Sequence, residues 1–325
     1  MRAVVVEQPG GPDVLVVRDV AEPLPGPDEV RVDVTAAGVN YIDVYHRTGK
    51  YPLPTPFVAG CEGAGVVTAV GQDVTGVGEG DRVAWAMVPR AGYAEQVVVP
   101  AHRVVPIPDG VSDETAAAVM LQGLTAHYLT SSTHPLRPGH VALVHAAAGG
   151  VGLLLTQAAV ARGARVIGTT STGEKADLAK AAGASDVIRY DEVAVPEEVR
   201  RLTGGAGVDV VYDGVGRATF EGSLDSLKPR GMMVLYGAAS GAPAPVDPNV
   251  LNTKGSLFLT RPSLAHHIAT REELLARAAE LFAWVSGGDL EVRVGARYLL
   301  PEAGRAHEDL EGRRTTGKSL ILPTE

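Results

Sequence analysis

The chain has 325 residues, of which 45% are hydrophobic and 21% charged, enough apolar sequence for about two folded domains. The net charge is −9, from 29 lysines and arginines against 38 aspartates and glutamates, which argues against a nucleic-acid-binding protein with a basic surface. A lone cysteine, Cys61, excludes an intramolecular disulfide, and the absence of a signal-peptide pattern or a membrane-length apolar run favours a cytoplasmic protein without membrane attachment.

Short β-strands separated by turns are predicted through the first hundred residues. The alternation of valine with polar residues, or runs of glycine and valine, predicts strands at 30–34, 63–70, 97–99 and 104–106. Proline and glycine clusters at 23–27, 78–81 and 106–110 predict the turns between them. This pattern is typical of a small barrel or an open β-fold.

Near residue 112 the chain begins to alternate strands with helices. Ser112 is a candidate N-cap, and two acidic residues and an alanine-rich stretch follow it. Strands are predicted at 141–145, 165–169, 187–188, 208–213 and 232–236, and helices at 152–162, 175–182 and 197–202. This alternation predicts a doubly wound parallel sheet, followed by an amphipathic helix at 271–285 and a tail strand at 318–322 that returns to the first domain.

The first strand of this series leads into a glycine-containing turn at 146–152. Aligned with the pattern G-x-G-x-x-G, Ala147 replaces the first glycine, while Gly149 and Gly152 occupy the other two positions. Gly149 allows the backbone to approach a pyrophosphate, and Gly152 allows the helix to pack on the strand. The turn predicts a dinucleotide site; taken alone, it also fits a tight turn in an unrelated α/β protein.

The second strand of the series indicates which dinucleotide binds. NAD enzymes usually carry an acidic residue at its end, for the ribose 2′-hydroxyl. Here residues 165–170 contain none, and Ser171, Thr172 and Lys175 follow. A lysine and hydroxyl groups attract a 2′-phosphate that a carboxylate would repel, so NADPH is predicted in preference to NADH. The alternative is that Lys175 is a solvated helix residue, with Glu174 weakening its field.

Two segments resemble the zinc-binding frame of the medium-chain dehydrogenases/reductases, but lack its ligands. In residues 36–43, Asn40 stands where the zinc enzymes have a cysteine, and in residues 60–65, Cys61 stands where they have a histidine. A catalytic zinc needs three protein ligands and an open position. No metal is therefore predicted, and Cys61 is interpreted as a small buried hydrophobic residue.

Together these segments resemble the zinc-free quinone oxidoreductase branch of that family, which includes the zeta-crystallins. The similarity runs through 38–43, 49–52, 80–83, 123–129, 145–152, 211–216, 254–257 and 260–264. It implies an α/β protein with a GroES-like catalytic domain at 1–124 and 262–325, and a Rossmann NADPH-binding domain at 125–261. It also implies a homodimer, for which 256–259 is the candidate edge strand.

The resemblance also implies the site residues. Those from Asn40 to Tyr45 would line the nicotinamide side, and the 2′-phosphate end would be held by Ser171, Lys175, Tyr190 and Arg314. Tyr190 is alternatively an ordinary aromatic residue at a strand end. The other expected cofactor contacts are Tyr41, Ile42, Asp43, Thr125, Tyr128, Gly149, Gly150, Val151, Gly214, Tyr236, Gly237, Ala238, Ala239, Pro262, Ser263 and Leu264. Gly214 departs from the serine or asparagine frequent in relatives, and Ala238 from an asparagine.

A quinone accepts electrons readily and needs no metal Lewis acid, which fits the missing ligands. The hypothesis is electron delivery from NADPH to a bound quinone, with Asn40, Tyr45 or Tyr51 polarising a carbonyl oxygen; the two tyrosines are equally well interpreted as apolar walls. The main alternative is an NADPH-dependent enone or enoyl (alkene) reductase. A zeta-crystallin-like RNA-binding or structural protein and a zinc alcohol dehydrogenase are further alternatives.

Overall fold

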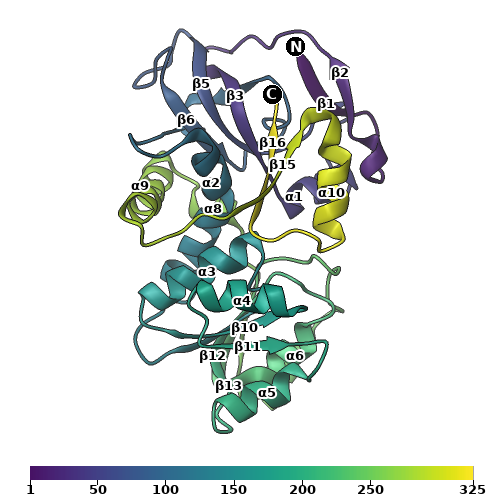
Figure 1. The fold of residues 1–325 in the computed structure, drawn as a ribbon, viewed down its shortest axis with the longest axis vertical. Helices are drawn as coiled ribbons and strands as arrows, with labels where there is room; N and C mark the ends of the chain where they lie inside the picture. The colour runs from purple at the N-terminus through teal and green to yellow at the C-terminus, as the bar shows by residue number, and fades with distance from the viewer. Residues whose placement is uncertain (325) are drawn as a thin grey trace. The chain divides into compact units, whose positions relative to one another are not determined.

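The structure is a computed structural model that describes residues 1–324. The chain divides into two compact units, unit 1 with residues 1–124 and 268–325, and unit 2 with residues 125–267 (Figure 1). The predicted α/β class, with a β-rich first domain and a doubly wound parallel sheet, is confirmed.

Unit 2 contains a six-stranded sheet whose strands all run parallel. Its order is β11-β10-β9-β12-β13-β14, so the chain starts in the middle and adds strands toward one edge, then toward the other. The strands are β9 (Val141–Val144), β10 (Arg165–Thr170), β11 (Asp186–Arg189), β12 (Val208–Asp213), β13 (Leu227–Leu235) and β14 (Phe258–Thr260).

Helices cover both faces of this sheet, as the connection of parallel strands requires. Figure 1 shows α3 (Gly150–Ala161) and α4 (Gly173–Ala181) on one face, and α5 (Val195–Leu202) and α6 (Phe220–Ser226) on the other. The remaining elements of unit 2 are the π-helix η3 (Leu129–Thr133), α7 (Pro248–Thr253) and α8 (Leu264–His267).

Unit 1 is built on a mainly antiparallel sheet of order β15-β16-β3-β5-β6-β8, with β7 also paired to β3. Its strands are β3 (Glu29–Val39), β5 (Glu62–Val70), β6 (Arg82–Ala86), β7 (Gln96–Pro100), β8 (Val105–Pro106), β15 (Val294–Leu299) and β16 (Lys318–Leu322). A second sheet contains β1 (Arg2–Val6), β2 (Val16–Asp19) and β4 (Phe57–Val58). The predicted return of the tail is confirmed, because β16 pairs with β3.

Four longer helices accompany these strands. They are α1 (Tyr41–Arg47), α2 (Asp113–Tyr128), whose first residues belong to unit 1, α9 (Arg271–Gly287) and α10 (Ala303–Glu311). Ser112 is the predicted N-cap of α2, since its hydroxyl accepts from the Thr115 N–H at 3.1 Å. Short 3₁₀ turns lie at η1 (Pro12–Val14), η2 (Ala101–Arg103) and η4 (Leu300–Glu302).

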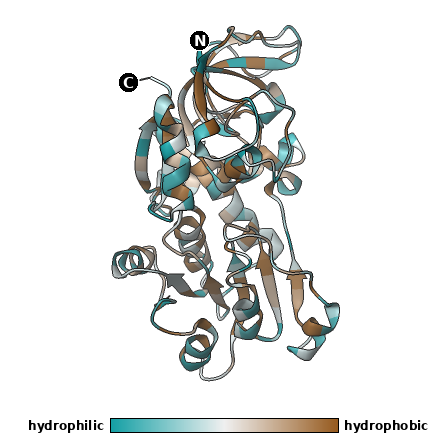
Figure 2. Ribbon diagram, turned by 90° about the vertical axis from the view of Figure 1, so that its right-hand side faces the viewer, coloured by the Kyte–Doolittle hydropathy of each residue, from teal (hydrophilic) through white to brown (hydrophobic). Residues whose placement is uncertain are grey.

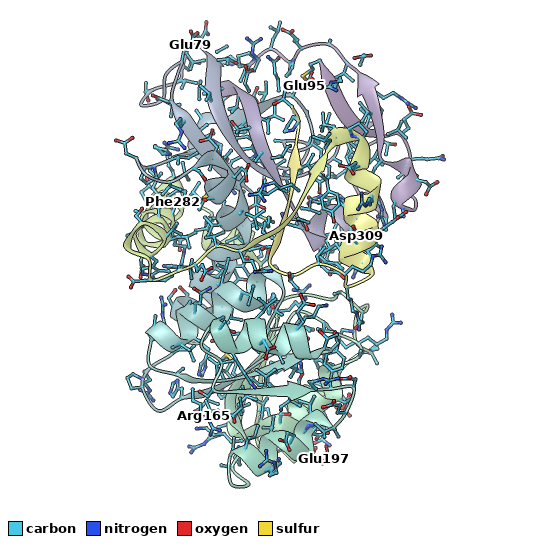
Figure 3. All side chains as sticks on the ribbon, viewed as in Figure 1. Glu79, Glu95, Arg165, Glu197, Phe282 and Asp309 are labelled. Carbon is cyan, nitrogen blue, oxygen red and sulfur yellow. The ribbon has the colours of Figure 1, made fainter. Side chains whose placement is uncertain are left out.

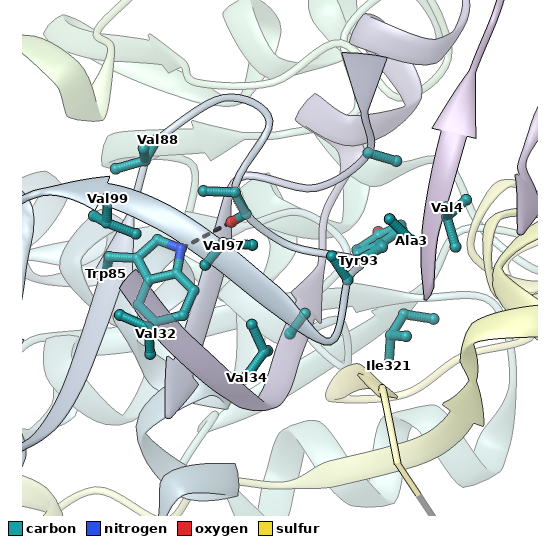
Figure 4. Packing of buried hydrophobic residues seen from close by; sticks show 14 of the residues in the cluster. Ala3, Val4, Val32, Val34, Trp85, Val88, Tyr93, Val97, Val99 and Ile321 are labelled. Atoms are coloured by element: carbon teal, nitrogen blue, oxygen red, sulfur yellow. Dashed lines mark hydrogen bonds between the residues drawn. The ribbon is translucent and has the colours of Figure 1, made fainter. Parts of the chain in front are cut away.

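Each unit has its own hydrophobic core. In Figure 2 the strands are mostly brown, the apolar colour, while the helices are banded in teal and brown. Acidic side chains such as Glu79 and Glu197 lie exposed on the outside (Figure 3). In unit 1, Trp85 is fully buried among valines, and its indole N–H donates to the Ala91 carbonyl at 2.8 Å (Figure 4). Within residues 1–324, no helix is long and apolar enough to cross a membrane.

Replacement of Trp85 tests this core. Trp85→Ala is expected to lower the free energy of unfolding by about 3–5 kcal/mol, because it leaves a cavity. Trp85→Phe keeps most of the volume but leaves the Ala91 carbonyl without its donor, for a smaller loss of about 1–3 kcal/mol. Urea unfolding measures both. Leu24→Ala, at a position 82% exposed, is the control, and an unchanged Trp85→Ala variant would contradict the assignment.

Candidate functional site

The candidate cofactor site of unit 2 lies at the carboxyl edge of the parallel sheet. The strand order reverses between β9 and β12, and ligands of such sheets bind outside the strand ends at this point. His145 follows β9, Thr169 and Thr170 end β10, and Asp213 ends β12. The predicted glycine turn therefore opens at the position where the topology places a ligand.

The glycine turn connects β9 to α3 through a close backbone contact. Ala146 has a positive φ of 51°, and its carbonyl accepts from the Gly149 N–H at 2.9 Å. A Cβ at Gly152 would collide with the same carbonyl, so glycine is required there. None of the described side chains caps α3 at Gly149, which leaves the N–H groups of Gly150 and Val151 directed out of the first helical turn. Such a helix start suits a phosphate.

A buried hydrogen-bond network supports this turn. The Ser223 hydroxyl donates to Asp213 Oδ2 at 2.9 Å and accepts from His145 Nε2 at 3.0 Å, so His145 Nδ1 accepts from the Thr169 hydroxyl at 3.0 Å. Burial lowers the pKa of His145, which keeps its imidazole neutral. Asp213 Oδ1 accepts two backbone N–H groups at 215–216. The network thus joins the turns that follow β9 and β12.

The residues predicted to hold a 2′-phosphate gather at the ends of β10 and β11. Thr172 caps α4 by accepting from the Lys175 N–H at 3.3 Å. The Tyr190 N–H donates to the Thr170 carbonyl at 3.2 Å, which holds Tyr190 beside the strand end that leads into Ser171. Tyr190 is 42% exposed, so its ring is open to a ligand.

The predicted residues that follow β12 and β13 lie against one another. A Cβ at Gly214 would lie 2.8 Å from the Tyr236 hydroxyl, and one at Gly237 would collide with the Gly214 carbonyl. The Ala239 N–H donates to the same carbonyl at 3.2 Å, and Ala238 is buried. Glycine at 214 therefore makes room for Tyr236.

Two further predicted segments of unit 2 meet through a ring contact. Tyr128, in α2, stacks on His267, at the end of α8, with 4.2 Å between ring centroids and an interplanar angle of 9°. Thr125 and Tyr128 are both buried, and burial raises the pKa of Tyr128. Residues 262–264 lead into α8, so the stacked pair joins them to the end of α2.

In unit 1, buried polar side chains surround Asn40. The Lys318 ammonium, in β16, donates to Glu62 Oε2 at 2.5 Å and to Asn40 Oδ1 at 2.8 Å. Glu62 also accepts from Asn40 Nδ2 at 2.7 Å and from the Leu121 N–H at 2.5 Å, and Gln122 donates to Asn40 Oδ1 at 3.3 Å. The side chains of Lys318 and Glu62 are 1% and 0% exposed. We call Lys318, Glu62, Asn40 and Gln122 the Lys318 cluster.

The Lys318 cluster fixes the orientation of the Asn40 amide. Its Nδ2 donates to Glu62 and, at 3.3 Å, to the Gly38 carbonyl, while its Oδ1 accepts from Lys318 and Gln122. To polarise a substrate oxygen as predicted, Asn40 Nδ2 would therefore have to donate to that oxygen in place of the Gly38 carbonyl, which accepts the longer of its two hydrogen bonds. A Cβ at Gly38 would collide with Glu62, which makes glycine necessary beside the cluster.

A second hydrogen-bond chain begins at Asp43, in the first turn of α1. Asp43 Oδ2 accepts from the Asn40 N–H at 2.8 Å and from the Tyr93 hydroxyl at 3.1 Å. The Arg47 guanidinium donates to His307 Nδ1 at 3.4 Å. Because Nδ1 is the acceptor, His307 Nε2 carries the proton and donates to the Tyr93 oxygen at 3.1 Å. The predicted cofactor residue Asp43 thus directs its carboxyl group into the core of unit 1.

Burial shifts the pKa values at both ends of this chain. It raises the pKa of Asp43 to about 7, although the Asn40 N–H opposes the shift. It lowers the pKa of His307 to about 3, and the charge of Arg47 adds to the decrease. His307 is therefore neutral at physiological pH, while Asp43 titrates near neutrality.

Three tyrosines cluster on and after α1. The rings of Tyr45 and Tyr51 meet edge to face with 5.1 Å between centroids, and Tyr41 lies 6.2 Å from Tyr45. Tyr45 is buried, Tyr51 is 40% exposed, and the Tyr41 hydroxyl donates to the Leu310 carbonyl at 3.2 Å. Ile42, also predicted at the site, is half-buried on the same helix. Tyr51 is thus the most accessible ring of the three.

Arg314 does not belong to the same unit as the other residues predicted for the 2′-phosphate, which are in unit 2. It belongs to unit 1. The Arg314 Nε donates to Oδ1 of Asp309, which lies in α10 (Figure 3), at 2.7 Å. The Arg314 side chain is 59% exposed. Its guanidinium is therefore oriented by Asp309.

The two positions aligned with zinc ligands do not fit a metal. The Asn40 amide is engaged in the Lys318 cluster. Cys61 is wholly buried, and burial together with the carboxylates of Asp43 and Glu62 raises its pKa well above the ordinary value. The Lys318 ammonium already neutralises Glu62. Across residues 1–324, no three His, Cys, Asp or Glu side chains are grouped as a metal site.

Sequence reasoning did not predict several residues of these networks, among them Glu62, Lys318, Gln122, Tyr93 and His307. Two carried a signal. Lys318 begins a strand that ends in three apolar residues, and Glu62 interrupts a run of small residues. A charged side chain within a buried strand requires a buried partner. Lys318 and Glu62 therefore each predict that such a partner exists, but the sequence does not identify it.

Comparison with known proteins finds two family models that match successive parts of the chain. Residues 26–109 match the model of the alcohol dehydrogenase GroES-like domain, and residues 150–284 match the zinc-binding dehydrogenase model. A quinone oxidoreductase from Pseudomonas aeruginosa is 49% identical over 315 residues, 97% of each chain.

Two further similarities bear on the cofactor and the substrate. The crystal structure of Escherichia coli quinone oxidoreductase complexed with NADPH superimposes with a TM-score of 0.96 at 43% identity, covering 99% of this chain and all of that one. A 2-haloacrylate reductase from a Burkholderia species is 42% identical and covers 99% of this chain and 98% of its own.

The Lys318–Glu62 pair is testable by a double-mutant cycle. Lys318→Met alone leaves the Glu62 charge buried and unpaired, and is expected to lower the free energy of unfolding by about 3–5 kcal/mol. Glu62→Gln combined with Lys318→Met removes both charges, and most of that loss is expected to be recovered. Urea unfolding of the two single variants and the double variant gives the coupling energy. Additive losses would refute the pairing.

The pKa of Asp43 predicts a pH dependence of stability. Because this pKa rises from 3.8 to about 7 on folding, the contribution of Asp43 is most favourable below about pH 4 and is lost as the pH rises to 7. Relative to Asp43→Asn, the wild type is expected to lose up to about 4 kcal/mol across that range.

Unfolding curves at a series of pH values measure the difference between the wild type and Asp43→Asn. Asp19→Asn, at an exposed carboxyl group of β2, is the control for a change of net charge. A difference that does not change with pH would show that Asp43 titrates normally.

Proposed function

The chain belongs to the quinone oxidoreductase family of the medium-chain dehydrogenases/reductases, and we propose that it reduces quinones with electrons from NADPH. The carboxyl edge of the unit 2 sheet carries this proposal. There the uncapped start of α3 offers backbone N–H groups, and β10 ends in hydroxyl side chains without an acid. The first feature suits a pyrophosphate, and the second suits a 2′-phosphate.

The residues of unit 2 fit NADPH chemically. Gly149, Gly150 and Val151 would hold the pyrophosphate, because Gly152 allows close packing behind them. Ser171 and Lys175 would hold the 2′-phosphate, with the exposed ring of Tyr190 beside them. When bound, NADPH supplies a hydride, which together with one proton converts a quinone to a hydroquinone.

Further cofactor contacts in unit 2 are proposed at Thr125, Tyr128, Gly214, Tyr236, Gly237, Ala238, Ala239, Pro262, Ser263 and Leu264. In unit 1 they are proposed at Tyr41, Ile42, Asp43 and Arg314. Asp43 would act by holding the backbone of Asn40 at the start of α1, as their 2.8 Å hydrogen bond supports. Arg314 would contact a phosphate while Asp309 orients its guanidinium.

The substrate-facing role is proposed for Asn40, Tyr45 and Tyr51. Lys318 and Glu62 hold the Asn40 amide in one orientation, so a quinone carbonyl would meet an oriented donor. The tyrosine rings would pack against the quinone ring. We infer that no metal takes part, since the Lys318 ammonium supplies positive charge beside Asn40 and already pairs with Glu62.

We also propose a homodimer in the cytoplasm. β14 is an edge strand of the six-stranded sheet, and Phe258 on it is 58% exposed, which favours pairing with a second copy. Sedimentation equilibrium that returns the mass of one chain would rule the dimer out.

Reduction of activated carbon–carbon double bonds is the second candidate. The similarity to a 2-haloacrylate reductase over nearly the whole chain favours it, since the same fold serves that protein. Both reactions place a hydride on an electron-poor acceptor, so only the substrate profile separates them.

The deciding experiment is steady-state oxidation of NADPH and NADH with a panel of quinones, enones and 2-haloacrylates, with metal analysis of the same sample. Rapid oxidation of NADPH by quinones in a metal-free sample supports the proposal. Turnover of enones or haloacrylates but not of quinones would identify the protein as a double-bond reductase instead. Stoichiometric zinc in the sample would overturn the metal-free mechanism.

Lys175 provides the test of cofactor choice. Lys175→Glu places a negative charge beside the proposed 2′-phosphate position, and we expect the KM for NADPH to rise by at least about tenfold while that for NADH changes little. Lys180→Glu makes the same charge change on the exposed side of α4 and is the matched control. Equal changes for both cofactors would remove Lys175 from the site.

A further inference from the structure

One side-chain oxygen of the Lys318 cluster has no hydrogen-bond partner among residues 1–324. It is Oε1 of Gln122, which is buried, while Nε2 of the same amide donates to Asn40 Oδ1 at 3.3 Å. A buried carbonyl oxygen without a donor destabilises a protein, and nearly all such atoms in folded proteins have a partner. Gln122 Oε1 is therefore the atom of this cluster that a hydrogen-bond donor fits.

The orientation of both amides follows from the charge of Glu62. Its carboxylate can only accept, so Asn40 directs Nδ2 to Glu62 at 2.7 Å and Oδ1 to the Lys318 ammonium. Gln122 must then direct Nε2 to Asn40 Oδ1, because two carbonyl oxygens in this position would repel each other. The remaining atom of the Gln122 amide, Oε1, is thus fixed as an acceptor.

Gln122 is the most accessible member of the cluster. The exposed fraction rises from 0% at Glu62 to 4% at Asn40 and 9% at Gln122. The Leu121 N–H donates to Glu62 Oε1, which holds this turn of α2 against the cluster. A molecule that reaches the Asn40 amide from solvent therefore also meets the Gln122 amide.

The two amides differ in what they can bind. A quinone carbonyl only accepts hydrogen bonds, so it suits Asn40 Nδ2 and leaves Gln122 Oε1 unpaired. A hydroxyl group beside that carbonyl can donate to Gln122 Oε1. A site that bonds a substrate hydroxyl discriminates against the analogue without the donor, because the buried acceptor then stays unpaired.

We propose that Gln122 is a specificity-determining residue that selects quinones with a hydroxyl group on a substituent beside the reacting carbonyl. This inference rests on the proposed function and identifies the substrate class of the same site. Asn40 donates to the quinone carbonyl, and Gln122 Oε1 accepts from the hydroxyl group.

The test compares 2-(hydroxymethyl)-1,4-naphthoquinone with 2-(methoxymethyl)-1,4-naphthoquinone, since only the first can donate. The wild type is expected to favour the hydroxymethyl quinone about three- to tenfold in kcat/KM, and Gln122→Met to lose this preference. Gln122→Met also removes the bond to Asn40, but that loss acts on both quinones alike, so the ratio isolates Oε1. Gln72→Met, at an exposed turn, is the matched control and should keep the preference.

Binding gives a readout that does not depend on turnover. Calorimetric titration of both quinones in the presence of NADP⁺, which cannot reduce them, is expected to show the same preference and its loss in Gln122→Met. Turnover of both quinones without a preference in the wild type, or with the same ratio in Gln122→Met, would overturn the inference and leave the proposed function standing. An unchanged ratio with a raised KM for NADPH would assign Gln122 to the cofactor instead. Turnover of neither quinone, nor of unsubstituted 1,4-naphthoquinone, would overturn both.

Discussion

The buried ion pair between Lys318 and Glu62 is the constraint on which the architecture of unit 1 depends. Two charges without solvent are tolerated only if their geometry and remaining hydrogen bonds are satisfied. Here Asn40, Gln122 and a backbone N–H complete them, so β16, β5, α2 and the start of α1 are held in one register. Gly38 is part of the same arrangement, because a Cβ at this position would collide with the side chains of Glu62 and Lys318.

In both units, buried polar groups connect and orient the elements of the candidate site. In unit 2, Asp213, Ser223 and His145 form a chain with a single consistent set of donors and acceptors, and this chain sets the distance between two strand-end turns. In unit 1 the Lys318 ammonium supplies a fixed positive charge beside Asn40 and Glu62. A fixed ammonium polarises its neighbours but leaves no open coordination position, which suits an acceptor that is already electron-poor.

The sequence predicted most of the doubly wound sheet, because its strands and three of its helices are local patterns with a recognisable period, but it did not predict α6. It also predicted the glycine turn, the acid-free end of β10 and the return of the tail strand. It did not predict α1, α10 or β15, which are short or lack a regular apolar period. The Lys318 cluster could not be predicted from the sequence, because Lys318 and Asn40 are 278 positions apart and only the folded topology brings them together.

The pairing of β16 with β3 has a consequence for synthesis on the ribosome. Glu62 emerges 256 residues before Lys318, an interval on the order of ten seconds or more at ordinary elongation rates. Throughout that interval β3 and β5 exist without the strand that neutralises their buried carboxylate. Unit 1 therefore begins to emerge before unit 2 but is completed after it, because its sheet needs Lys318 from a segment that follows unit 2 in the chain.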